Sequence, residues 1–251
     1  MIEYVKLQHR ICGSNMKPRP IYHHVDAPAI EGVEVEAHFR TGYIHSPLRN
    51  WRMQRWFAQH YEGCAANKTY YGFSIPTPSV NVIYQMTHLF SHYFQEGVGL
   101  RQILDMYYAL IAWRESVENG YGKQSQGMWS EGLGTAVMSA QEVMAVLRSF
   151  GMTRFAAAVM YVLQEVFAMP ALCYICEPNE RVGKKLLEEI MKGGNFGQYD
   201  ERGKEFKNGG MIKHGLWKMK RVMRLVRSYP EEALWEPVFR VWHLGWREIH
   251  G

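Results

Sequence analysis

The sequence predicts an α+β protein that is mainly α, and three observations support this class. Residues 31–40 alternate between apolar and polar side chains, which is typical of a strand. From residue 48 onward, apolar residues recur at helical spacing in one segment after another. The composition, with 47% hydrophobic and 21% charged residues, is that of a folded globular protein. We therefore expect a small β-containing segment over residues 1–47, followed by an α-helical domain over residues 48–251.

Prolines shape the prediction for residues 1–30, which we expect to be irregular because Pro18, Pro20 and Pro28 interrupt regular structure. The next stretch, EGVEVEAHFR, predicts a strand over residues 31–40. Period-two alternation places its polar side chains on one face, namely Glu34, Glu36, His38 and Arg40. A lone strand is not stable, so we expect it to pair in a hairpin or at a sheet edge.

Apolar periodicity predicts a succession of helices after Pro47. The first covers residues 48–60, and a loop over residues 61–78 leads to a second helix with Ser79 as candidate N-cap. The apolar positions of this second helix are Val82, Ile83, Met86, Leu89, Phe90 and Tyr93. Further helices are expected over residues 100–117, 139–150, 153–168, 179–192 and 211–227 and after Pro230, with Gly151 as a candidate C-cap.

Charge and cysteine usage limit the classes of partner and compartment. The net charge is +5, and residues 204–227 hold eight basic side chains against one acidic side chain. This stretch is either a solvated helix face or a surface that attracts phosphate or another anion.

Cys173 and Cys176 form an isolated CxxC that we interpret as buried free thiols. Sparse cysteines, no apolar run of about 18 residues and no signal peptide together predict a cytoplasmic protein without membrane contact.

The alternating strand is the first candidate for chemistry. Glu34, Glu36 and His38 share one face, where two carboxylates and an imidazole could hold Mg²⁺ or transfer protons. A solvated face of a half-exposed strand explains the same pattern, and both interpretations stay open here.

Three other groups of residues are weaker candidates. His88 and His92 share a helix face, but the residue after His88 is a leucine instead of the glutamate of a zinc protease, so we predict a structural role. Arg101 and Asp105 have the spacing of an intrahelical ion pair. The loop at residues 193–197 is either a phosphate cradle or a tight turn between helices.

Several stretches together resemble the uncharacterised nucleotidyltransferase family. They are YHHVDAPAIEGVEVEAHFR at 22–40, IPTPSVNVIYQMTHLFSHYFQEGVGLRQILDMYYAL at 75–110, ICEPNERVGKKLLEEIMKGGNFGQYDER at 175–202 and YPEEALWEPVFRVWHLGWR at 229–247. The resemblance implies the remnant of a nucleotidyltransferase-type sheet followed by a helical domain. It also implies Mg²⁺-dependent transfer of a nucleotidyl group from an NTP to an unspecified acceptor, on metal ions held by an acidic pair and a third carboxylate.

The resemblance assigns site residues and also marks a departure from the family. Glu36 becomes the candidate third carboxylate and metal ligand, with Glu34 second, and His38 matches the histidine of the family's strand. The candidate ligand-binding residues are Arg40, Arg101, Asn195 and Asp200. The chain has no DxD or DxE motif, so we expect a truncated and catalytically incomplete protein.

A non-catalytic role is the alternative prediction. A helical binding or scaffold module could recruit a protein partner at the exposed strand edge or at the basic helix near 211–227. Nucleic acid is disfavoured as a partner, because aromatic residues do not interleave with the basic ones as a base-stacking platform requires.

Overall fold

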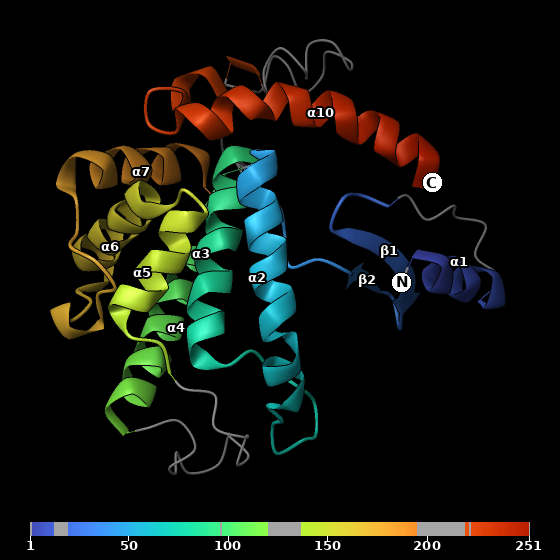
Figure 1. The fold of residues 1–251 in the computed structure, drawn as a ribbon, viewed down its shortest axis with the longest axis horizontal. Coiled ribbons are helices and arrows are strands. Elements are labelled where there is room, and N and C mark those ends of the chain that lie inside the picture. The colour runs from blue at the N-terminus through green and yellow to red at the C-terminus, as the bar shows by residue number, and fades with distance from the viewer. Residues whose placement is uncertain are drawn as a thin grey trace.

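The computed structural model describes residues 2–12, 20–95, 97–119, 137–194, 219–220 and 222–250. A small N-terminal unit of helix α1 (Ile2–Ile11) and an antiparallel hairpin, β1 (His24–Ile30) and β2 (Val33–His38), lies beside a body of helices (Figure 1). The body contains α2 (Pro47–Ala66), α3 (Pro78–Gln95), α4 (Leu100–Asn119), α5 (Ala140–Ser149), α6 (Thr153–Phe167), a 3-10 turn (Ala171–Cys173) and α7 (Glu180–Gly193). The predicted mainly helical α+β class is confirmed.

Helix α10 (Pro230–His250) connects the two parts of the molecule. It runs across one end of the helical body and continues toward the hairpin, so the C-terminus lies near the N-terminal elements (Figure 1). The Lys6 ammonium donates a hydrogen bond to the carbonyl of His250 at 3.1 Å. Among the described residues, no helix is both long and apolar enough to cross a bilayer.

The core of the body lies where the periodicity predicted it. The six apolar side chains predicted to face the core from α3 are all buried, namely Val82, Ile83, Met86, Leu89, Phe90 and Tyr93. The ring of Phe155, which is fully buried in α6, contacts the Phe90 ring at a centroid distance of 5.1 Å. Burial of these side chains against α4 and α6 is the main driving force that holds the helices together.

The N-terminal residues correct one prediction, because residues 1–30 are not irregular throughout. Val5 and His9 of α1 are buried against the hairpin, and His9 Nε2 lies 2.9 Å from the carbonyl oxygen of Asp26. Pro28 is tolerated in β1 because the strand register shifts between Ala27 and Ile30, where the ladder needs no N–H from the proline. Long-range contacts thus order α1 and β1, although the prolines of residues 1–30 alone suggested a loop.

The loop predicted over residues 61–78 is also shorter than expected. Helix α2 extends to Ala66 and α3 begins at Pro78, a residue type suited to the first helical turn. Ser79 is therefore inside α3 and is not its N-cap; its hydroxyl accepts a hydrogen bond of 2.9 Å from the Met138 N–H. This bond ties the start of α3 to the approach to α5.

Gly151 ends α5 as predicted. Its φ of 78° is in the left-handed region, and its N–H donates to the Arg148 carbonyl at 3.0 Å. The Met152 N–H donates to the Leu147 carbonyl at 2.8 Å, which completes a Schellman motif.

A buried carboxylate joins α10 to the start of α2. Glu232, which is 2% exposed, accepts hydrogen bonds from the backbone N–H groups of His45 and Ser46. Its Oε1 also lies 2.8 Å from His45 Nδ1. The neighbouring Glu231 accepts from the Ser46 hydroxyl at 2.7 Å and forms an ion pair with Arg49. These contacts fix the linker between the hairpin and α2 against α10.

Candidate functional site

One face of the hairpin collects imidazoles and carboxylates from both strands. His24 is the cross-strand partner of His38, and Asp26 is the partner of Glu36, so all four side chains point to the same side. Glu31 and Gly32 form the two-residue turn, and both have the positive φ values, 52° and 81°, that tight hairpins require. The turn therefore fixes the register that brings these four residues together.

Short distances connect the members of this group. His38 Nε2 lies 3.2 Å from Glu36 Oε2, and His24 Nδ1 lies 3.7 Å from the same oxygen. On the other side of its ring, His24 Nε2 lies 4.0 Å from Asp26 Oδ1. We call these four residues together with His23 the hairpin cluster.

His23 adds a third imidazole just before β1 begins. Its Nε2 lies 3.1 Å from His24 Nδ1, and its carbonyl accepts hydrogen bonds from the N–H groups of Phe39 and Arg40 at 3.0 and 3.2 Å. Burial, and then the proximity of His24 and other histidines, lowers the pKa of His23 to about 3. This imidazole is therefore neutral at physiological pH.

His88 and His92 of α3 lie near enough to the hairpin cluster to help lower the pKa of His23. Their Nε2 atoms are 3.1 Å apart, and the His88 ring stacks on the Tyr84 ring. Burial, followed by the effects of His92 and His38, lowers the pKa of His88 to about 4. The mutual contact of the two rings fits the structural role predicted from their spacing, and it extends the imidazole-rich surface from β2 to α3.

Arg40 lies between two pockets large enough for a ligand. One pocket, of about 620 Å³, is lined by His38, Phe39, Arg40, Thr41, Gln54, Phe57, Ala58, Tyr61 and Tyr84. The other, of about 520 Å³, is lined by Tyr22, Arg40, Ile44, His45, Pro47, Asn50, Trp51, Gln54, Trp235, Val238, Phe239 and Trp242. The Arg40 guanidinium lies over the Tyr22 ring, 4.3 Å from its centre, and donates to the Tyr22 carbonyl at 2.7 Å. Both volumes fall within the range of about 300–1,000 Å³ that is typical of ligand sites.

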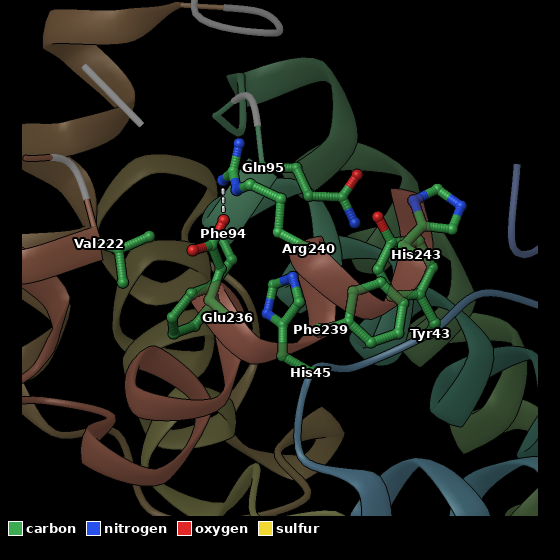
Figure 2. Close-up of a pocket in the computed structure, with 9 residues that line it drawn as sticks. All are labelled: Tyr43, His45, Phe94, Gln95, Val222, Glu236, Phe239, Arg240 and His243. Atoms are coloured by element: carbon green, nitrogen blue, oxygen red, sulfur yellow. Dashed lines mark hydrogen bonds and ion pairs between the residues drawn. The ribbon is translucent and has the colours of Figure 1, made fainter. Parts of the chain in front are cut away.

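A third pocket, between the linker and α10, is structural. Figure 2 shows its lining, in which Glu236 and Arg240 form an ion pair one helical turn apart. The Tyr43 and Phe239 rings stack at a centroid distance of 4.8 Å. Its volume of about 140 Å³ is below the usual size of a ligand pocket, so we assign it to the packing of α10.

The structure brings together three of the site residues predicted from the sequence. Glu36 and His38 are in contact, and Arg40 and His38 line the same pocket. Glu34 is exposed on β2 and has no ion-pair partner within the described ranges.

The remaining predicted site residues fall outside this cluster. Arg101 is exposed in the first turn of α4, lines neither pocket beside Arg40 and forms no ion pair with Asp105, so the predicted pair is wrong. Asn195 and Asp200 lie outside the described residues, as does most of the basic segment 204–227. Cys173 and Cys176 are both free thiols, as predicted, but only Cys173 is fully buried, while Cys176 is half-buried. Burial raises the pKa of Cys176 to about 11.

Sequence reasoning missed His23, His24 and Asp26 because residues 1–30 were expected to be irregular. The signal was present in the sequence. His24 and Asp26 are two positions apart, and so are Glu36 and His38 on the other side of a Glu-Gly turn. Folding that pattern into a hairpin pairs histidine with histidine and carboxylate with carboxylate.

The buried histidines predict a specific pH dependence of stability. The pKa values of His23 and His88, about 3 and 4 in the folded chain, lie below the ordinary 6.5 that applies after unfolding. The unfolded chain therefore binds protons first, and stability should fall as the pH drops from 6.5 toward 4. We expect the thermal midpoint, measured in chelator, to fall less steeply in a His23→Gln/His88→Gln variant. Identical slopes in the two proteins would contradict this account.

The hairpin cluster lies within a segment of the chain that matches a known protein family. Residues 7–120, under half of the chain, match the sequence model of a family described as uncharacterised nucleotidyltransferase. The match begins inside α1, includes the whole hairpin and reaches the end of α4. The chain therefore carries a nucleotidyltransferase-like segment, which confirms the resemblance over these residues.

The other comparisons add no relative. No curated protein and no solved structure matches the chain significantly. The resemblance that we infer for residues 175–202 and 229–247 lies outside the family match and stays a prediction.

Proposed function

We propose that this chain is a nucleotidyltransferase-like protein that binds an NTP together with Mg²⁺ at the hairpin but transfers the nucleotidyl group inefficiently, with Asp26 and Glu36 as the cation ligands. The observation that carries the proposal is the cross-strand pairing of these two carboxylates inside the segment similar to the nucleotidyltransferase family. Their side chains are 57% and 55% exposed, so a hydrated cation and a phosphate could reach both.

The residues fit one Mg²⁺ ion. Magnesium is commonly bound by one or two carboxylates, with substrate phosphates and water completing its coordination. When bound, the ion would neutralise charge on the phosphates and activate the attacking oxygen. The hairpin itself supplies the two carboxylates in a fixed register, and His38 next to Glu36 is positioned to take up a proton.

The two pockets beside Arg40 support the proposal because they offer room for the base and the phosphates of an NTP. The pocket that contains Trp51, Trp235 and Trp242 offers aromatic faces on which a nucleobase can stack. The pocket that contains His38 leads from Arg40 to the hairpin cluster. A guanidinium is suited to a phosphate, so Arg40 would hold the phosphates between the base and the cation.

The acidic residues of the chain predict NTP binding without efficient nucleotidyl transfer. The chain has three aspartates, Asp26, Asp105 and Asp200, and none is two positions from another acidic residue. The acidic pair that holds two metals in such transferases is therefore missing from the sequence, and one carboxylate pair holds one ion.

Calorimetric titration of ATP, CTP, GTP and UTP, with and without Mg²⁺, tests this proposal. We expect at least one NTP to bind in a Mg²⁺-dependent manner, and the Asp26→Asn/Glu36→Gln variant to weaken that binding by about tenfold or more, since about 1.4 kcal/mol corresponds to tenfold. Glu34→Gln is the matched control, because it removes a carboxylate from the same strand and should leave binding unchanged. NTP binding that does not depend on Mg²⁺, or that the double substitution leaves unchanged, would contradict the proposal. Turnover by this chain would contradict the expectation that it transfers the nucleotidyl group inefficiently.

A further inference from the structure

The hairpin cluster contains a second donor set, made of nitrogen atoms. His23, His24 and His38 each offer one ring nitrogen, and these atoms all lie within 4.8 Å of one another. Zn–N bonds of about 2.0–2.1 Å in a tetrahedral site place ligand atoms roughly 3.3 Å apart. His23 Nε2 and His24 Nδ1 are already 3.1 Å apart. Small ring rotations would therefore bring the three imidazoles onto one ion.

We propose that His23, His24 and His38 form a binding site for a divalent transition metal, with Zn²⁺ as its representative ion. Imidazole nitrogen suits zinc, copper, nickel and iron, whereas Mg²⁺ takes oxygen ligands. Three imidazoles leave a fourth position for water, for a substrate or for a neighbouring carboxylate. This site does not depend on the proposed nucleotidyl transfer, because it needs no nucleotide and uses different ligand atoms.

The backbone holds the three ligands before any metal binds. His24 and His38 are fixed opposite each other by the strand register. His23 is anchored through its carbonyl, which accepts the N–H groups of Phe39 and Arg40 at the end of β2. The ligands thus come from both sides of one ladder, and metal binding would require side-chain rotation instead of backbone movement.

The surroundings of the imidazoles also favour a ligand role. Glu36 lies 3.2 Å from His38 Nε2, so when His38 binds an ion through Nδ1, this carboxylate holds the other ring nitrogen as in known metal sites. The Nδ1 atom of His23 is buried and forms no hydrogen bond with any described residue. An ion bound at this nitrogen would therefore displace no hydrogen bond from a described residue.

Titration of Zn²⁺ into the full chain, stripped of metal with a chelator and free of nucleotide, tests the site. We expect one Zn²⁺ per chain, and an X-ray absorption spectrum with neighbours at about 2.0 Å and the outer-shell scattering that imidazole rings produce. Loss of a residue that orients a metal ligand typically weakens metal binding about 10–100-fold, so Glu36→Gln should weaken Zn²⁺ binding about tenfold or more. His24→Ala and His38→Ala remove ligands, so each should weaken Zn²⁺ binding more than about a hundredfold. His60→Ala, which removes a histidine of α2 outside the cluster, is the matched control.

Several results would overturn the assignment. These are absence of stoichiometric Zn²⁺ binding, a wild-type spectrum without the outer-shell scattering of imidazole rings, or equal losses for His60→Ala. The spectrum is recorded on the wild-type chain, so it tests the metal site even if a substitution unfolds the hairpin. NTP binding with Mg²⁺ is scored separately, so a failure of the zinc site leaves the proposed function standing, and the reverse also holds.

Discussion

Replacing Glu232 with alanine should lower the free energy of unfolding by about 2–6 kcal/mol, because it leaves two buried backbone N–H groups without an acceptor, at about 1–3 kcal/mol each. Glu232 is 2% exposed, accepts the backbone N–H groups of His45 and Ser46, and lies 2.8 Å from the His45 ring. After the substitution these donors stay buried without an acceptor, which costs more than the hydrogen bonds contribute on their own. Urea denaturation followed by circular dichroism measures the loss.

Glu188→Ala is the matched control for that loss. Glu188 forms a surface ion pair with Lys192 at 3.5 Å, and its side chain is 65% exposed. Exposed pairs one helical turn apart contribute about 0.3–0.5 kcal/mol, so this variant should unfold near the wild-type midpoint. If Glu232→Ala destabilised the chain no more than Glu188→Ala, the contact between α10 and the linker would not hold the fold together.

The helical body was predictable because its information is local. Apolar spacing identified α3 and its buried face, and Gly151 marked the end of α5. The capping box at Ser139 and Glu142 provides a further local signal for the start of α5. Each of these features depends on residues within a few positions of one another.

The candidate site was predictable only in part, because its β1 residues join the site only through the pairing of β1 with β2. The alternation of β2 identified Glu36, His38 and Arg40 as one polar face. Their partners on β1 become visible only when the turn at Glu31–Gly32 sets the register. The contact between Glu232 and His45 spans 187 positions and leaves no local pattern at all.

The hairpin cluster places two kinds of donor on one face. Asp26 and Glu36 offer oxygen atoms, which suit Mg²⁺, and His23 offers nitrogen next to His24 and His38, which suits a transition metal. Glu36 contacts both sets, since its Oε2 lies 3.2 Å from His38 and 3.7 Å from His24. We therefore expect the two proposed cations to compete, with Zn²⁺ binding suppressing Mg²⁺-dependent NTP binding.

Gly183→Ala should destabilise the chain by about 1–3 kcal/mol, although helix propensity alone predicts the opposite. Alanine inside a helix is normally about 1 kcal/mol more favourable than glycine. A methyl group at Gly183 in α7 would overlap the Cβ and Cγ atoms of Tyr161 in α6. These atoms lie near the backbone and Tyr161 is 8% exposed, so the two helices would have to separate. The free energy of unfolding from urea titration gives the sign directly.

Gly245→Ala separates the packing effect from propensity. Gly245 lies inside α10, is exposed, and has no atom within 4 Å of the position that a methyl group would occupy. Propensity alone acts there, so we expect a gain of about 0.5–1 kcal/mol. Opposite signs at the two glycines would establish that close approach of α6 and α7 requires Gly183. Stabilisation by both substitutions would show that the two helices are not packed as tightly as the structure indicates.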